Sequence, residues 1–137
     1  MPHSGSCLCG GVRYELDVPL TEISVCHCRM CRKASGTAFV AVAPVPADKF
    51  RLVAGAAQMQ TYESSPGKKR WFCGICASPI YSESILRPGM VRIRLGTLDT
   101  PVGHGPSYHI YVADKADWDE IHDGLPQYPA HVTTPAA

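Results

Sequence analysis

Seven cysteines lie in three short clusters, and their spacing points more directly to chemistry than any other feature of this sequence. The clusters are a C-x-C pair, a C-x-C-x-x-C triplet and a C-x-x-C pair: Cys7 and Cys9; Cys26, Cys28 and Cys31; Cys73 and Cys76. Such spacing is typical of thiolate ligands to a metal ion. The two pairs supply four thiolates, the ligand set of a closed structural zinc site, and the triplet supplies three. We therefore predict two zinc ions, one that stabilises the fold and one that does chemistry.

The triplet is predicted to be the reactive centre. Three thiolates leave the fourth position of a tetrahedral zinc ion open to water, a side chain or a substrate thiol. A thiol bound there would be deprotonated at neutral pH and held as a nucleophile. Cationic side chains near the triplet would balance its negative charge or attract an anionic substrate: Arg29, Arg32 and Lys33.

Two alternatives stay open for these clusters. A histidine could close the triplet site and make it purely structural, and the candidates are His27, His104 and His109. His27 is the weakest of them, because a residue between two ligands in C-x-C usually points away from the metal. The pairing of the first cysteine pair with the last pair is likewise not fixed by spacing alone.

Disulfides fit the cysteines less well than metal ions do. The number of cysteines is odd, and the N-terminal residues lack the charged-then-apolar pattern of an export signal. The 13 Lys and Arg against 12 Asp and Glu give no electrostatic reason to expect nucleic-acid or membrane binding. No apolar run approaches the ~18 residues of a membrane span. We expect a cytoplasmic protein that keeps its thiols reduced.

Short apolar segments separated by glycines and prolines predict a mainly β fold, in a single domain over residues 1–137. The predicted strands are residues 12–17, 37–43, 50–53, 59–63, 69–72, 91–95 and 108–112. Only residues 28–34 and 115–122 are predicted to form short helices. The tail from Pro126 onward has too little apolar content to pack independently, so we expect it to be loose at its end.

Three motifs resemble the glutathione-dependent formaldehyde-activating enzyme family, which includes centromere protein V. They are residues 5–14 (GSCLCGGVRY), residues 26–36 (CHCRMCRKASG) and residues 70–79 (RWFCGICASP). The second resembles the family pattern C-H-C-x-x-C-R-[RK]-x-[ST]-G. A C-terminal signature adds Leu98, Asp99, Pro106, residues 109–111 and Trp118, so the likeness covers residues 5–128.

That resemblance implies an antiparallel β-tent fold with two zinc ions. By position, the structural ion would be held by Cys7, Cys9, Cys73 and Cys76, and the catalytic ion by Cys26, Cys28 and Cys31. The implied activity is that of a carbon–sulfur lyase that reversibly joins formaldehyde and glutathione. One departure is Ala77, which stands where the family usually has glycine. An alanine there would be strained if the turn requires a positive φ.

The resemblance also leaves a second class of function open, a zinc-stabilised module that binds a protein or a nucleic acid. The near-neutral charge argues against nucleic acid as the partner. A third hypothesis is a thiol sensor, in which the triplet loses its metal on oxidation. Of these, the lyase is the leading prediction, with glutathione and formaldehyde as substrates.

Overall fold

The computed structural model describes residues 3–132, which group into two compact units. The first unit is formed by the chain up to Thr21 and by Ala43–Gly103. The second is formed by Glu22–Val42 and by the chain from His104 onward. Each unit contains one of the two cysteine groups. The expectation that residues 1–137 behave as a single domain stays a prediction.

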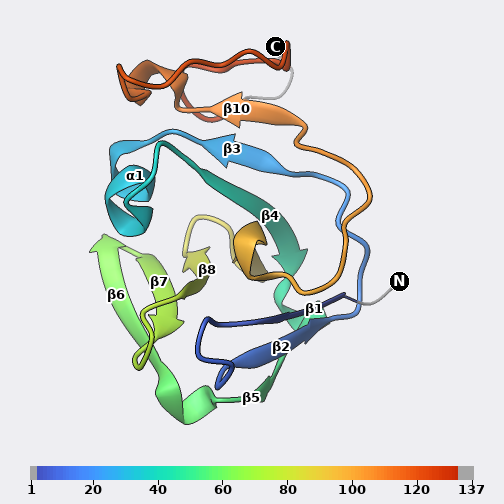
Figure 1. The fold of residues 1–137 in the computed structure, drawn as a ribbon. Coiled ribbons are helices and arrows are strands. Elements are labelled where there is room, and N and C mark those ends of the chain that lie inside the picture. The colour runs from blue at the N-terminus through green and yellow to red at the C-terminus, as the bar shows by residue number, and fades with distance from the viewer. Residues whose placement is uncertain (1–2, 133–137) are drawn as a thin grey trace. The chain divides into compact units, whose positions relative to one another are not determined.

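A three-stranded antiparallel sheet begins the first unit (Figure 1), with the strand order β1-β2-β5. Its strands are β1 (His3–Ser6), β2 (Arg13–Leu16) and β5 (Phe50–Ala54). Along β2, Tyr14 and Leu16 are buried, whereas Arg13 is exposed, which is the alternation of a strand with one face on a core. Gly5 pairs with Tyr14. A Cβ at Gly5 would lie 2.2 Å from the Tyr14 ring, so only glycine fits there.

Four further strands of the first unit form an antiparallel meander in the order β9-β8-β7-β6. Their bounds are β6 (Met59–Ser65), β7 (Lys68–Cys73), β8 (Pro79–Ser84) and β9 (Met90–Arg94). Short 3₁₀ turns punctuate the unit at Ala47–Lys49, Ala56–Gln58 and Leu95–Thr97. The turn between β7 and β8 contains the last cysteine pair, so this meander positions half of the four-cysteine group.

In the second unit, β3 (Ser24–Cys26) pairs in parallel with β10 (Tyr108–Ile110) and antiparallel with the start of β4 (Val40–Pro46). Helix α1 (Arg29–Ser35) follows β3, and a 3₁₀ turn, η4 (Val112–Asp114), follows β10. Cys28 caps the start of α1, because its Sγ accepts a hydrogen bond from the Cys31 N–H at 3.3 Å. Gly36 ends the helix in the left-handed conformation, with φ 70°.

The mainly β prediction is confirmed, and every predicted strand matches a strand of the structure. The prediction missed three strands: β1, β3 and β8. Of the two predicted helices, α1 is present and the segment 115–122 is wrong, since it is extended or turn-like in the structure. Lys115 has ψ 141°, and its Nζ donates to the carbonyls of Ala116 and Asp119. These side-chain bonds satisfy acceptors that a helix would satisfy through its backbone.

The chain after Pro126 is hydrogen-bonded to β10 over its first residues. The His109 N–H donates to the Pro126 carbonyl at 2.9 Å, and the Tyr128 N–H donates to the His109 carbonyl at 2.9 Å. The predicted loose end includes residues 133–137, which lie outside the described residues. Among the helices of residues 3–132, none is long and apolar enough to cross a membrane.

Candidate metal centres

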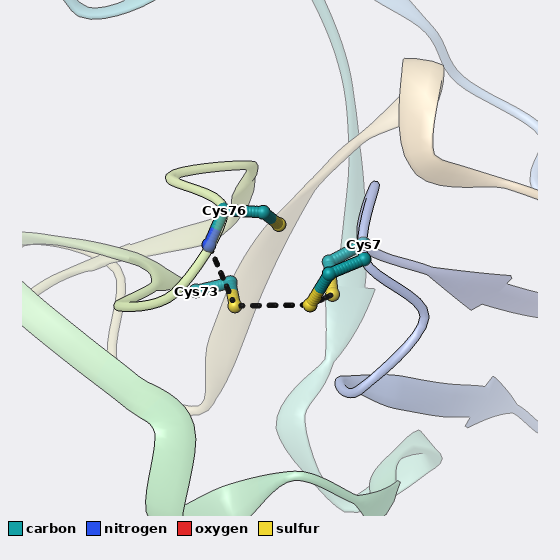
Figure 2. A group of neighbouring side chains, drawn as sticks. Cys7, Cys73 and Cys76 are labelled. Atoms are coloured by element: carbon teal, nitrogen blue, oxygen red, sulfur yellow. Dashed lines mark hydrogen bonds between the residues drawn. The ribbon is translucent and has the colours of Figure 1, made fainter.

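Four thiols of the first unit come together as one group: Cys7, Cys9, Cys73 and Cys76. Their sulfurs all lie within 4.8 Å of one another. The Cys7 and Cys9 sulfurs are 3.5 Å apart, and those of Cys9 and Cys73 are 3.9 Å apart. Ligand sulfurs around a tetrahedral zinc ion are separated by about 3.8 Å, since each lies about 2.3 Å from the ion. The group therefore fits a four-coordinate metal, and Figure 2 shows three of its side chains converging.

The loop between β1 and β2 positions the first two thiols. The Cys7 N–H donates to the Val12 carbonyl at 3.0 Å, and the Val12 N–H donates to the Cys7 sulfur at 3.2 Å. Gly10 lets the chain turn between them, with φ 79°. The loop is closed by its own backbone, so it presents both sulfurs on a defined turn.

The turn after β7 positions the other two thiols. Backbone N–H groups of Ile75 and Cys76 donate to the Cys73 sulfur at 3.4 and 3.5 Å. The Ala77 N–H donates to the Cys73 carbonyl at 2.8 Å, and Ala77 has φ 67°. The turn therefore does place Ala77 at a positive φ, the condition under which the sequence analysis expected an alanine to be strained. The Ser78 hydroxyl lies 3.3 Å from the Cys76 sulfur.

Gln58 connects the two turns of this group, a contact that the sequence analysis missed. Its Nε2 lies 3.5 Å from the Cys73 sulfur and 3.9 Å from the Cys9 sulfur. A Cβ at Gly11 would lie 2.4 Å from that nitrogen, and one at Gly74 would lie 3.0 Å from the Gln58 carbonyl. Both glycines therefore permit the close approach of the turns to Gln58. No local sequence pattern around Gln58 signals this role.

Hydrogen bonds set the acidity of these thiols. The Ser78 hydroxyl and N–H lower the pKa of Cys76 to about 5. The backbone N–H groups of Cys76 and Ile75 also lower the pKa of Cys73. The Gly11 N–H lowers the pKa of Cys9, but the adjoining thiols and burial outweigh it and raise that pKa to about 11. Hydrogen bonds from the protein therefore favour the thiolate forms of Cys73 and Cys76. A bound cation would favour ionisation of the other thiols of the group.

The second group consists of three thiols of the second unit: Cys26, Cys28 and Cys31. Their sulfurs also lie within 4.8 Å of one another. Cys26 ends β3, Cys28 caps α1, and Cys31 is buried in the first turn of the helix. The strand end and the helix start therefore place the three sulfurs together, as the spacing predicts. Hydrogen bonds with Cys28 and Cys31, together with burial, raise the pKa of Cys26.

No histidine or carboxylate of residues 3–132 joins these three sulfurs within the same distance. Each histidine that the sequence offered as a fourth ligand has a ring nitrogen within hydrogen-bond distance of another group. His27 and His109 are bonded to each other, with 2.9 Å between His27 Nε2 and His109 Nδ1. The Nδ1 of His104 lies 3.1 Å from the Gly105 carbonyl oxygen. Among the described residues, the arrangement is thus a three-thiol group without a fourth protein ligand.

A hydrogen-bonded chain runs from the buried His27 through the buried His109 to the exposed Asp123. His109 Nε2 lies 2.8 Å from Asp123 Oδ2, and a carboxylate can only accept, so this nitrogen carries the proton. Nδ1 of a neutral His109 then accepts from His27 Nε2. The chain leaves His27 Nδ1 buried, with no hydrogen-bond partner among the described residues. Burial, and then the neighbouring His109, lowers the pKa of His27.

The cysteine spacing does not predict this hydrogen-bonded chain of side chains, which holds His27 between Cys26 and Cys28. His109 was predicted only as a possible ligand, and Asp123 carried no local motif. Hydrogen bonding to His109 lowers the pKa of Asp123, so the carboxylate is ionised at neutral pH. The chain therefore fixes the position of His27 and, with it, the backbone that carries Cys26 and Cys28.

Apolar and aromatic side chains pack against the three-thiol group. Ile110 is buried against Cys26 and Cys31, and partly buried residues pack around them: Val40, Tyr108, Tyr111, Tyr128 and Val132. Tyr108 and Tyr128 meet edge to face, with ring centroids 5.7 Å apart. Low-polarity walls strengthen electrostatic interactions at such a site. Both thiol groups therefore fit a soft divalent cation such as zinc, the first with four ligands and the second with three.

The chain belongs to the glutathione-dependent formaldehyde-activating enzyme family, whose model matches residues 2–114. A protein of Halomonas elongata named "Putative glutathione-dependent formaldehyde-activating enzyme" is 30% identical over 125 residues, which cover 85% of this chain and 79% of the relative. A crystal structure of a Rhodobacter sphaeroides protein superposes with a TM-score of 0.62 at 24% identity. The match covers 75% of this chain and 97% of that one, and it shows that the two proteins share a fold.

Proposed function

We propose that this protein is a zinc-dependent carbon–sulfur lyase that joins formaldehyde reversibly to a thiol such as glutathione. Membership of the family supports the reaction class. The observation that carries the proposal is the difference between the two thiol groups: one offers four ligands and the other only three. A closed set is suited to holding a fold together, and an open set is suited to binding a substrate.

Cys26, Cys28 and Cys31 would hold the catalytic zinc in this proposal, and Cys7, Cys9, Cys73 and Cys76 the structural one. Held by these three protein ligands, a zinc ion would supply an open position at which a substrate thiol would be bound in its thiolate form. The protein's own part is to fix the three sulfurs through α1 and the His27–His109–Asp123 chain. The apolar residues around them limit the access of water.

The reaction itself balances without an external oxidant or reductant. The thiolate sulfur attacks the carbonyl carbon of formaldehyde, and a carbon–sulfur bond forms as the carbon–oxygen π bond breaks. The oxygen takes up one proton, and the thiol has given up one, so the sum of the reactants equals S-hydroxymethylglutathione. The reverse reaction breaks the carbon–sulfur bond and returns both reactants.

NMR exchange spectroscopy on mixtures of glutathione, formaldehyde and their adduct tests the proposal. The zinc-loaded protein is expected to accelerate exchange between free glutathione and the adduct, and Cys28→Ser is expected to abolish that acceleration. Serine is a strong helix cap, so this variant keeps a hydrogen-bond acceptor for the Cys31 N–H at the start of α1. The change therefore removes a thiolate while preserving the local helix.

Metal content provides the matching control. Wild type is expected to bind two zinc ions per chain and Cys28→Ser one, with an unchanged far-ultraviolet circular dichroism spectrum. Exchange at the uncatalysed rate with fully loaded wild type would contradict the proposed activity. Undiminished exchange with Cys28→Ser would contradict the assignment of the three-thiol group as the reactive centre.

A further inference from the structure

Strand β6 lies at the edge of its sheet, and β7 is the one strand of residues 3–132 that pairs with it. Two other edge strands are covered by further segments of the chain. The Ser4 carbonyl of β1 accepts from the Asp99 N–H at 2.8 Å, and the His109 N–H of β10 donates to the Pro126 carbonyl at 2.9 Å. By contrast, residues 60–63 of β6 are exposed. This strand therefore offers one side of its backbone for pairing.

The hydrogen bonds to β7 determine which backbone groups of β6 point outward. The Gly74 N–H donates to the Gln58 carbonyl at 2.7 Å, and these two residues continue the register of β6 with β7. Alternate residues of an antiparallel ladder bond to the neighbouring strand, so residues 58, 60 and 62 face β7. The N–H and C=O groups of Thr61 and Glu63 therefore point away from the sheet.

The sequence of β6 does not protect this edge. Natural edge strands commonly carry a lysine, a proline or a bulge that prevents another strand from pairing. Residues 59–63 contain neither lysine nor proline, and their register with β7 is regular up to Glu63. The Glu63 carboxylate accepts from the Gly67 N–H at 3.0 Å. Strand β5 also has a single neighbour, but it carries the charged Arg51, and its pairing with β2 contains a register shift.

Tyr62 lies at the centre of β6 and is 67% exposed. Its ring takes part in none of the aromatic pairs within residues 3–132. A two-fold axis at Tyr62 would place this ring beside the same ring of a second copy. Aromatic pairs directly opposite each other stabilise antiparallel strands. The same axis places Thr61 opposite Glu63 of the second copy, so outward backbone groups meet and no like charges are directly opposed.

We propose that β6 pairs antiparallel with β6 of a second copy of this chain, about a two-fold axis at Tyr62. The strand is complementary to itself, because its outward donors and acceptors and its exposed ring all meet their equivalents in one register. Such a contact uses the same surface on both copies and closes as a dimer. Since the contact is a single strand long, we expect the dimer to dissociate on dilution.

Sedimentation velocity of the zinc-loaded protein, from about 5 to about 500 μM, tests the dimer. The mass of wild type is expected to rise with concentration from that of one chain towards that of two. Tyr62→Lys and Tyr62→Glu are each expected to weaken association about tenfold or more, because like charges would face each other across the axis. An equal mixture of the two variants should associate again, since opposite charges then meet. Tyr62 is exposed, so the far-ultraviolet circular dichroism of both variants should match wild type.

Val53→Lys is the matched control. Val53 is also an apolar side chain on an edge strand, 47% exposed in β5, and its replacement should leave association unchanged. Amide hydrogen exchange tests the backbone part of the contact. The N–H groups of Thr61 and Glu63 should exchange more slowly at high protein concentration than at low concentration. Those of Gln60 and Tyr62, which already face β7, should change less.

Four results would overturn this inference. One is a wild-type protein that stays monomeric at about 500 μM. A second is a dimer that Tyr62→Lys leaves intact or that Val53→Lys also disrupts, because the contact would then lie elsewhere. Failure of the mixed Tyr62 variants to associate would contradict the two-fold axis. A dimer without concentration-dependent protection of Thr61 and Glu63 would contradict strand pairing.

Discussion

His27 Nε2 lies 2.9 Å from His109 Nδ1, so the residue between Cys26 and Cys28 is bonded to β10, the strand that pairs in parallel with β3 just before it. Both rings are buried. His109→Phe keeps a ring in that place but removes the partner of His27 Nε2. We expect the free energy of unfolding to fall by about 1–3 kcal/mol, the cost of an unsatisfied buried polar group. Urea denaturation of the zinc-loaded protein measures it.

The matched control for that substitution is His122→Phe. His122 is an exposed histidine whose Nε2 lies 3.1 Å from Glu120 Oε2, and its side chain is 79% exposed. Exposed ion pairs contribute little, so this change is expected to stay within about 0.5 kcal/mol of wild type. Equal effects of the two substitutions would contradict a stabilising role for the buried hydrogen bond between His27 and His109.

The raised pKa of Tyr14 predicts how the stability of the protein changes at alkaline pH. Its hydroxyl lies 2.7 Å from the Thr97 hydroxyl, which itself donates to the Arg94 carbonyl at 2.9 Å. Burial raises the pKa of Tyr14 from 10.0 to about 12. The folded state therefore retains the phenol proton when the unfolded state has lost it. Stability from this group is complete below pH 10 and is lost as pH rises through 12.

Tyr14→Phe isolates that contribution. Between pH 8 and pH 11, wild type is expected to lose about 1.4 kcal/mol more stability than Tyr14→Phe, because about one pKa unit of the shift is crossed in that interval. Urea denaturation at the two pH values measures the difference, and absorbance at 295 nm follows phenolate formation. Parallel stability curves for the two proteins would show that Tyr14 titrates normally.

The backbone conformation of Ala77 predicts that its replacement by glycine stabilises the protein. Its φ of 67° lies in the left-handed region, where a Cβ costs about 1–2 kcal/mol. Ala77→Gly removes this strain but gives the unfolded chain more freedom, so we expect a net gain of about 0.5–1 kcal/mol. Ala57→Gly is the control, because Ala57 is exposed in a 3₁₀ turn with negative φ and should lose stability. Thermal or urea unfolding compares the two, and a loss in Ala77→Gly would contradict the strain.

The three-thiol group could be predicted from spacing because its cysteines are local, whereas the union of Cys7 and Cys9 with Cys73 and Cys76 joins residues 64 positions apart and was only implied by the family resemblance. Cys26, Cys28 and Cys31 lie within one strand end and one helix turn, so their spacing determines that they meet. The His27–His109 bond joins residues 82 positions apart and depends on the parallel pairing of β3 with β10. No periodicity in three-residue strands signals such a pairing. Trp118 lines a cavity beside α1 from a turn, and the sequence wrongly predicted a helix there. This cavity could therefore not be predicted from the sequence.

Strands were missed where their stability comes from neighbours and not from their own residues. β1 has the sequence HSGS, which has little β propensity, and it is held by its register with β2. β8 begins at Pro79 and pairs with β7 and β9 on its two sides. Their positions are set by tertiary pairing, which a single sequence does not reveal.

The two thiol groups should respond differently when a ligand is removed. Cys73 is fully buried, and its sulfur accepts from two backbone N–H groups and lies 3.9 Å from that of Cys9. If the four-thiol group holds a structural zinc, its loss removes more free energy than a small domain can spare. We expect Cys73→Ser to lose the cooperative urea transition and near-ultraviolet circular dichroism. Cys28→Ser, which retains a helix cap in the other unit, should keep both. A cooperatively folded Cys73→Ser protein that still catalyses exchange would refute the division into a structural and a catalytic centre.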